Sequence, residues 1–208
     1  MRSKHVTFDA GSLLLEGRVY APDAEPTAGV VVCHPHPLYG GDASSHVVLT
    51  VCDALVMNGM AALAFNFRGV GGSQGNHDNG VGEQEDAIAA LRCLQETLPS
   101  VQRLGLAGYS FGAGVALSAA TRIPGLAALA LVSGGADPEA CARLPAFPKL
   151  AIVGEADPAF TSGRLKRAVD AMPEPKELVT VPNVDHFWGI GTDALRRTIG
   201  GFFLKALA

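Results

Sequence analysis

Aromatic residues and cysteines are scarce in this chain, and long apolar runs are missing. Its 208 residues are 6% aromatic and include four cysteines, far apart at Cys33, Cys52, Cys93 and Cys141. This spacing fits neither a zinc site with paired ligands nor a small disulfide framework, so we expect free thiols in a reducing cytoplasm. No apolar run is long enough to span a membrane, and residues 1–11 lack the apolar centre of a signal peptide.

Positive charge is also sparse. The chain has 16 Lys and Arg against 20 Asp and Glu, a net charge of −4, and no basic cluster is interleaved with aromatics. Nucleic acid and membrane surfaces are therefore not expected as partners. With 48% hydrophobic residues, the length predicts one well-buried core, and hence a single domain over residues 1–208.

Short apolar runs alternate with helical patterns along most of the chain. Residues 6–8 and 13–20 predict an antiparallel hairpin at a sheet edge. Apolar runs typical of strands buried on both faces follow at 29–33, 61–67, 104–107, 127–132, 150–153 and 178–181. Helical spacing occurs at 47–57, 83–98, 111–122, 164–172 and 194–207. The order predicts an α/β fold: a mostly parallel sheet of about eight strands with helices on both faces, whose loops meet at one edge.

Ser110 stands in the sequence Gly-Tyr-Ser-Phe-Gly, between an apolar strand and a helix of small residues. This context predicts a nucleophile elbow, in which a serine occupies a sharp turn and Gly108 and Gly112 let strand and helix pack closely. An ordinary helix N-cap is the alternative interpretation. Residues 71–75 have the same Gly-x-Ser-x-Gly pattern but no flanking strand or helix, so we interpret Ser73 as a loop residue.

A serine nucleophile needs a histidine base and an acid that orients it. His186 is the one histidine that follows the last strand, and Asp157 follows the strand before it. Asp137, after an earlier strand, is the reserve candidate for the acid, and Asp185 is too close to the histidine to reach its far nitrogen. A surface loop histidine and a turn aspartate are the plainer interpretations of His186 and Asp157.

The order serine, aspartate, histidine, together with the elbow, resembles the alpha/beta-hydrolase superfamily over nearly the whole chain. Residues 66–73 resemble its Asp-x-Arg-Gly-x-Gly-x-Ser turn, with Asn66 in place of aspartate. Residues 34–37 resemble its His-Gly-x-Pro loop, with Pro35 in place of glycine. The run His-Pro-His-Pro followed by Gly40 and Gly41 is similar to small, cap-less bacterial serine hydrolases. Only a short segment separates the strands at 127–132 and 150–153, so we expect no large cap.

Two backbone N–H groups must stabilise the oxyanion of such an enzyme. Phe111, directly after the serine, is one predicted donor. The resemblance implies His36 as the second, with Leu38 or Tyr39 as alternatives, since Pro35 and Pro37 have no N–H. We expect an open site that cleaves small esters or thioesters through an acyl-enzyme. The alternatives are a peptidase or amidase with the same triad, and a catalytically silent binding protein on the same fold.

The same loops supply further candidates for substrate contact. These are His34, Leu38, Tyr39, Tyr109 and Trp188. Core packing is an equally good interpretation of Trp188 and of its neighbour Phe187. We expect no metal, because His34 and His36 lack a third ligand, and we interpret His34 as a residue that fixes the loop. We expect no cofactor, because no phosphate-binding glycine motif fits. The chain gives no reason to prefer a monomer or a homodimer.

Overall fold

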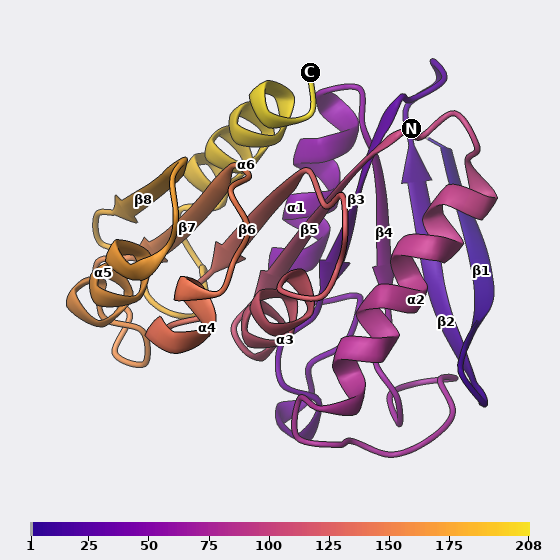
Figure 1. Ribbon diagram of the computed structural model, residues 1–208, viewed down its shortest axis with the longest axis horizontal. Coiled ribbons are helices and arrows are strands. Elements are labelled where there is room, and N and C mark those ends of the chain that lie inside the picture. Colours follow the sequence, from indigo (N-terminus) through magenta and orange to yellow (C-terminus); the bar gives the residue numbers. More distant parts are fainter. Residues whose placement is uncertain (1) are drawn as a thin grey trace.

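An eight-stranded sheet with helices on both faces organises the computed structural model, which describes residues 2–208 except the side chain of Ser162 (Figure 1). The strands are β1 (Arg2–Ala10), β2 (Leu13–Ala21), β3 (Ala28–Cys33), β4 (Ala61–Phe65), β5 (Arg103–Tyr109), β6 (Ala128–Val132), β7 (Lys149–Gly154) and β8 (Lys176–Val181). The helices are α1 (His46–Met57), α2 (Gly82–Thr97), α3 (Phe111–Ala120), α4 (Pro138–Ala142), α5 (Ser162–Ala171) and α6 (Thr192–Ala206), with a 3₁₀ turn, η1, at Pro37–Tyr39.

The strands lie in the order β1-β2-β4-β3-β5-β6-β7-β8. β1 and β2 form the predicted antiparallel hairpin at one edge, and β2 also runs antiparallel to β4. From β4 to β8 every neighbouring pair is parallel. The carboxyl ends of these six strands therefore face the same edge of the sheet, where the predicted site residues occur.

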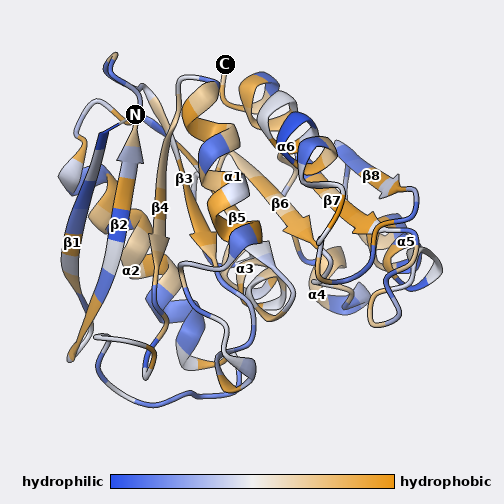
Figure 2. Cartoon of the chain, turned by 180° about the vertical axis from the view of Figure 1, so that it is seen from behind, coloured by the Kyte–Doolittle hydropathy of each residue, from blue (hydrophilic) through white to orange (hydrophobic). Residues whose placement is uncertain are grey.

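Burial explains why the apolar runs became strands. Every residue of β3, β4, β6 and β7 is buried, as expected for strands covered on both faces. In Figure 2, β6 and β7 are largely orange, whereas the edge strand β1 is mostly blue or pale. The edge strand β8 is only partly buried.

Two apolar cores lie on the two sides of the sheet. On one side α2, α3, α4 and α5 contribute buried residues to the first core. On the other side α1 and α6 pack against each other and form the second core (Figures 1 and 2). The four cysteines are free and buried in these layers, and burial raises the pKa of each thiol.

The main departures from the predicted elements lie at the functional edge. The strand predicted at 61–67 ends at Phe65, because the chain turns away and Phe67 donates its N–H to the His34 ring. η1 and α4 are too short to produce a helical pattern in the sequence. The segment between β6 and β7 contains only α4, so no inserted cap covers this edge of the sheet. In the part of the chain that the structure describes, no helix combines the length and apolarity of a membrane span.

Candidate active site

Ser110 lies on the turn between β5 and α3 in a conformation that non-glycine residues rarely adopt, with φ 55° and ψ −116°. The two flanking glycines make this turn fit. A Cβ on Gly108 would lie 2.2 Å from the Gly112 carbonyl oxygen, and one on Gly112 would lie 2.4 Å from the carbonyl oxygens of Cys33 and His34. The Ser110 side chain makes no capping hydrogen bond to α3, so its hydroxyl is not used as a helix N-cap.

The structure brings Ser110 together with His186 and Asp157. Ser110 Oγ lies 3.1 Å from His186 Nε2, and His186 Nδ1 lies 2.9 Å from Asp157 Oδ2. The Asp157 side chain is fully buried, and its Oδ1 accepts the N–H groups of Ala159 and Phe160 at 2.9 Å. One carboxylate oxygen thus fixes the turn after β7 while the other faces the imidazole.

The two other aspartates considered for the acid are used differently. Asp137 caps α4, with Oδ1 accepting from the Glu139 and Ala140 N–H groups. Asp185 accepts the N–H of Phe187. Of the three aspartates, Asp157 alone lies within hydrogen-bond distance of the His186 ring.

The 34–41 loop runs beside this row of residues. Within it the N–H of Leu38 donates to His36 Nδ1, and the N–H groups of Tyr39 and Gly41 donate to the His36 carbonyl oxygen. The N–H groups of His36 and Phe111 have no hydrogen-bond acceptor among residues 2–208. The rings of these two residues are 4.7 Å apart. Both amides are thus available to an outside acceptor, whereas those of Leu38 and Tyr39 are occupied.

His34 holds this loop in place and does not line the cleft. The side chain is buried, its Nδ1 donates to the Pro35 carbonyl oxygen at 2.7 Å, and its Nε2 accepts the Phe67 N–H at 3.0 Å. Burial lowers the pKa of His34 to about 4, so the ring is neutral at pH 7. Burial and these two hydrogen bonds agree with the interpretation of His34 as a loop-fixing residue and correct its place among the candidates for substrate contact.

The other substrate-contact candidates divide into two groups. Leu38 and Tyr39 are exposed beside the site, at 70% and 87%. Tyr109 and Trp188 are buried beneath it: Tyr109 donates its hydroxyl to the His186 carbonyl oxygen at 2.8 Å, and Trp188 donates Nε1–H to Ser133 Oγ at 3.0 Å. These two support the histidine loop, and Phe187 is the exposed aromatic there.

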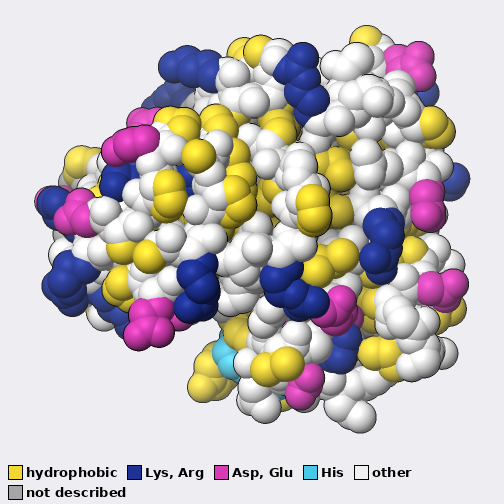
Figure 3. Space-filling view, in the orientation of Figure 1, with side chains coloured by type: hydrophobic (Ala, Val, Ile, Leu, Met, Phe, Trp, Pro, Cys, Tyr) yellow, Lys and Arg dark blue, Asp and Glu magenta, His cyan; other side chains and the backbone are white. Residues whose placement is uncertain are grey.

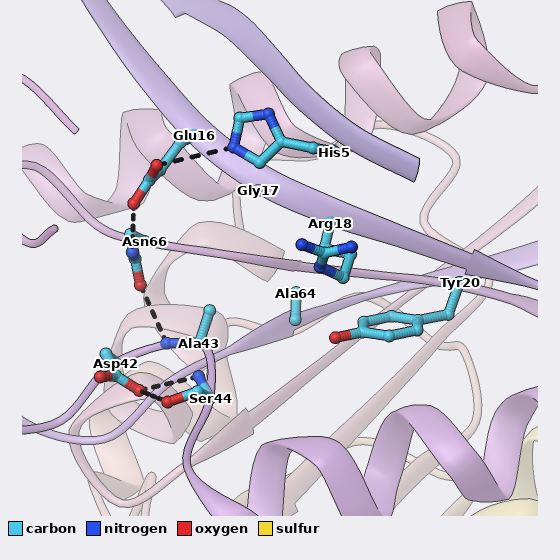
Figure 4. Close-up of a pocket in the computed structure, with 10 residues that line it drawn as sticks. All are labelled: His5, Glu16, Gly17, Arg18, Tyr20, Asp42, Ala43, Ser44, Ala64 and Asn66. Carbon is cyan, nitrogen blue, oxygen red and sulfur yellow. Dashed lines mark hydrogen bonds and ion pairs between the residues drawn. The ribbon is translucent and has the colours of Figure 1, made fainter. Parts of the chain in front are cut away.

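A network behind the 34–41 loop explains the asparagine at position 66. Asn66 Oδ1 accepts the Ala43 N–H at 2.9 Å, and its Nδ2 donates to Glu16 Oε1 at 2.7 Å (Figure 4). Hydrogen bonds from Gly72 and Asn66 lower the pKa of Glu16. An aspartate at position 66 would face this carboxylate, whereas the asparagine can donate to it. Ser73 is a buried part of the same turn, as predicted for a loop residue.

A cleft of about 430 Å³ extends from Ser110 along α3, and we call it the α3 cleft. One wall contains Val81 and Gln84, and the other contains Phe160 and Arg164. The Phe160 ring stacks on the His186 ring, with centroids 5.7 Å apart. Figure 3 shows a hollow at the lower edge of the molecule, where the carboxyl ends of the strands lie.

Sequence reasoning missed these wall residues because they come from two helix starts, those of α2 and α5, that have no recognisable motif. The same holds for His77, whose ring lies 5.0 Å from that of His36 and 5.3 Å from that of Phe111. Among the described residues, no group of three or more His, Cys, Asp or Glu side chains is placed to hold a metal ion.

Comparisons with known proteins agree with this architecture. Residues 11–163 match the family described as X-Pro dipeptidyl-peptidase (S15 family). An uncharacterised protein of Rickettsia prowazekii is 34% identical over 211 residues, which cover 96% of this chain and 88% of that protein.

Two solved structures are similar over almost their whole length. An alpha-beta serine hydrolase homologue from Coxiella burnetii is 33% identical, with a TM-score of 0.86 and coverage of 99% of this chain and 97% of that one. A serine hydrolase without lid from Xanthomonas campestris is 30% identical, with a TM-score of 0.86 and coverage of 98% and 94%. Fold and matches together make the chain a member of the X-Pro dipeptidyl-peptidase (S15) family and a lidless hydrolase of the alpha/beta-hydrolase superfamily.

Proposed function

We propose that this protein is a serine hydrolase that cleaves small esters or thioesters through an acyl-enzyme. The observation that carries the proposal is the continuous row from Ser110 Oγ to His186 Nε2, at 3.1 Å, and from His186 Nδ1 to Asp157 Oδ2, at 2.9 Å. A serine hydroxyl is a weak nucleophile until a neighbouring base takes its proton, and this arrangement supplies the base and the acid that orients it.

In the first half of the reaction, His186 Nε2 takes the Ser110 proton while Oγ bonds to the carbonyl carbon. The carbonyl oxygen becomes an oxyanion and accepts hydrogen bonds from the N–H groups of Phe111 and His36. Asp157 keeps the Nδ1 proton directed towards itself and stabilises the imidazolium. Collapse of the tetrahedral intermediate breaks the bond to the alcohol or thiol, which leaves with the proton from Nε2.

The second half of the reaction releases the acid. Water loses a proton to His186 Nε2 and attacks the acyl carbon, and the second tetrahedral intermediate expels Ser110 Oγ, which regains its proton from the imidazolium. No cap closes over the site, so the substrate remains partly exposed. We therefore expect activity on 4-nitrophenyl esters to be greatest at acyl chains of about six carbons or fewer. A maximum at dodecanoate would contradict this.

Labelling with a fluorophosphonate probe tests the nucleophile directly. The wild-type protein should label stoichiometrically and hydrolyse 4-nitrophenyl acetate, and Ser110→Ala should do neither. Ser73→Ala is the matched control, because Ser73 has the same local sequence pattern but is buried in a turn. Folded wild-type protein that never labels would favour a silent binding protein on this fold.

A peptidase is the second candidate, and the observation that favours it is the match of residues 11–163 to the S15 peptidase family. The two functions share the nucleophile and differ in the leaving group. Turnover should be compared for 4-nitrophenyl acetate, the matching anilide and a dipeptidyl anilide with proline at its second position. Ester hydrolysis with no detectable cleavage of either anilide would support the esterase, and cleavage of the dipeptidyl anilide with a kcat/KM comparable to that of the ester would support the peptidase.

A further inference from the structure

The α3 cleft is longer than an acetyl group requires. Ser110, Gly114 and Ser118 line its floor at intervals of four residues, which corresponds to about 12 Å along a helix. A Cβ on Gly114 would meet no heavy atom within 4 Å, so there is open space above this position. A substrate bound at Ser110 therefore has room for an arm that follows the helix.

The wall beside this arm carries one unpaired cation. Arg164 lies with its guanidinium carbon 5.2 Å from the centre of the Phe160 ring, and its Nη1 donates to the Ala159 carbonyl oxygen at 3.3 Å. These two contacts restrict the side chain without neutralising its charge. No described carboxylate pairs with Arg164, and Arg164 is the one Lys or Arg among the described residues that line the α3 cleft.

One acidic residue, Asp137, also lines the α3 cleft. Its Oδ1 accepts two backbone N–H groups at the start of α4, at 3.0 and 3.4 Å, so part of its charge is stabilised within its own turn. The guanidinium of Arg164 has one of its five N–H groups committed to a carbonyl oxygen and retains donors in the fork geometry that matches a carboxylate.

We propose that the natural substrate carries a carboxylate on the arm that lies in the α3 cleft, and that Arg164 binds it while Ser110 attacks the ester. This inference rests on the proposed function and specifies its substrate class. Arg164 contacts substrate away from the reacting atoms, so it determines specificity and takes no part in proton transfer.

Two pairs of esters test the proposal, because the carboxylate can be on either side of the scissile bond. On the acyl side, the 4-nitrophenyl monoester of glutaric acid is compared with 4-nitrophenyl pentanoate. On the leaving-group side, 4-acetoxybenzoate is compared with phenyl acetate. Each kcat/KM is divided by the second-order rate constant for hydroxide-catalysed hydrolysis of the same ester, and the selectivity is the ratio of the charged to the neutral ester.

For at least one pair of esters we expect a selectivity of about three- to tenfold at low ionic strength. The selectivity should fall towards one in 0.5 M NaCl, because the ion pair between Arg164 and the substrate carboxylate is partly exposed to solvent. Arg164→Gln should reduce the ratio to about one, and Arg164→Glu should bring it below one. Arg167→Gln is the matched control, since Arg167 is an exposed arginine of the same helix that does not line the cleft. It should leave both activity and selectivity unchanged.

Three results would overturn the proposal. The first is a wild-type selectivity of one or less for both pairs of esters, and the second is a selectivity that survives in Arg164→Gln. The third is preferred cleavage of the cationic 4-nitrophenyl ester of 4-(trimethylammonio)butanoate, which would point to Asp137 as the binding residue. Failure of the proposed function has a different signature. In that case the wild-type protein neither labels with a fluorophosphonate nor cleaves any of these esters.

Discussion

Replacing Gly112 by alanine should damage both the stability and the activity of this protein, although alanine is the better helix former. In an open helix, Gly→Ala stabilises by about 0.5–1 kcal/mol. At position 112 the new Cβ would lie 2.4 Å from the carbonyl oxygens of both Cys33 and His34, about 1 Å inside ordinary contact. These are backbone atoms of the last residue of β3 and the first residue of the 34–41 loop, so they cannot rotate away as a side chain could.

Overpacking of this kind costs about 1–3 kcal/mol or more, which exceeds the gain in helix propensity. We expect a net loss of about 1–2 kcal/mol, or a decrease in Tm of about 2–8 °C for a chain of this size. The displaced loop holds the His36 N–H. A shift of about 1 Å there should lower kcat for 4-nitrophenyl acetate about 100-fold.

Two other glycines provide controls for this experiment. Gly114 in α3 and Gly201 in α6 are both helical, and a Cβ on either meets nothing within 4 Å. Alanine at each should raise Tm by about 1–4 °C, and Gly201→Ala should keep full activity because it is far from the site in sequence and structure. Thermal unfolding and initial rates measure both effects. A Gly112→Ala protein as stable and active as Gly201→Ala would refute this reasoning.

Three further predictions concern the acid, the substituted turn and the buried histidine. Asp157→Asn should reduce kcat by about 10³–10⁴-fold with little change in KM, because the asparagine amide can hold the His186 imidazole in the wrong tautomer. Steady-state kinetics measures this effect, and a loss of kcat below tenfold would contradict the prediction. Asn66→Asp should lower the free energy of unfolding by about 2 kcal/mol at pH 7, since it faces Glu16, and adding Glu16→Gln should restore most of the loss in urea titrations. The pKa of His34 falls from 6.5 to about 4 on folding, so the unfolded chain takes up the proton first and stability should fall as pH drops from 6.5 to 4. Between pH 7 and pH 5 this amounts to about 2 kcal/mol, and His34→Gln should lose that part of the pH dependence even though its stability at pH 7 is lower.

The sheet could be predicted from the sequence because its strands are short apolar runs separated by helical spacing. Each parallel strand buried on both faces leaves such a run, and the partial alternation in residues 13–20 identifies the hairpin. Boundaries were less accurate where polar residues extend an element. β8 begins at Lys176, two residues before its first apolar residue, and β5 includes Arg103. The strand order depends on long-range pairing and leaves no local pattern.

The site was predictable to the extent that its residues follow strands directly. Ser110, Asp157 and His186 come after β5, β7 and β8, where the fold class brings loops together, and His186 lies within hydrogen-bond distance of both Ser110 and Asp157. Whether a nearby side chain supports the site or lines it could not be predicted. His34 and Trp188 were candidates for substrate contact with an interior role as the alternative, and burial and hydrogen bonds assign both to the interior. Phe160 and Arg164 had no motif to identify them.

The burial of all four cysteines makes the protein well suited to site-specific labelling. Every native thiol is shielded from reagents, and burial raises its pKa, which suppresses the reactive thiolate. A single cysteine introduced at Ser118, on the floor of the α3 cleft, should therefore be the one group that maleimide modifies in the folded protein. A fluorophore attached there would report in real time when the cleft fills and empties, without removal of any native cysteine.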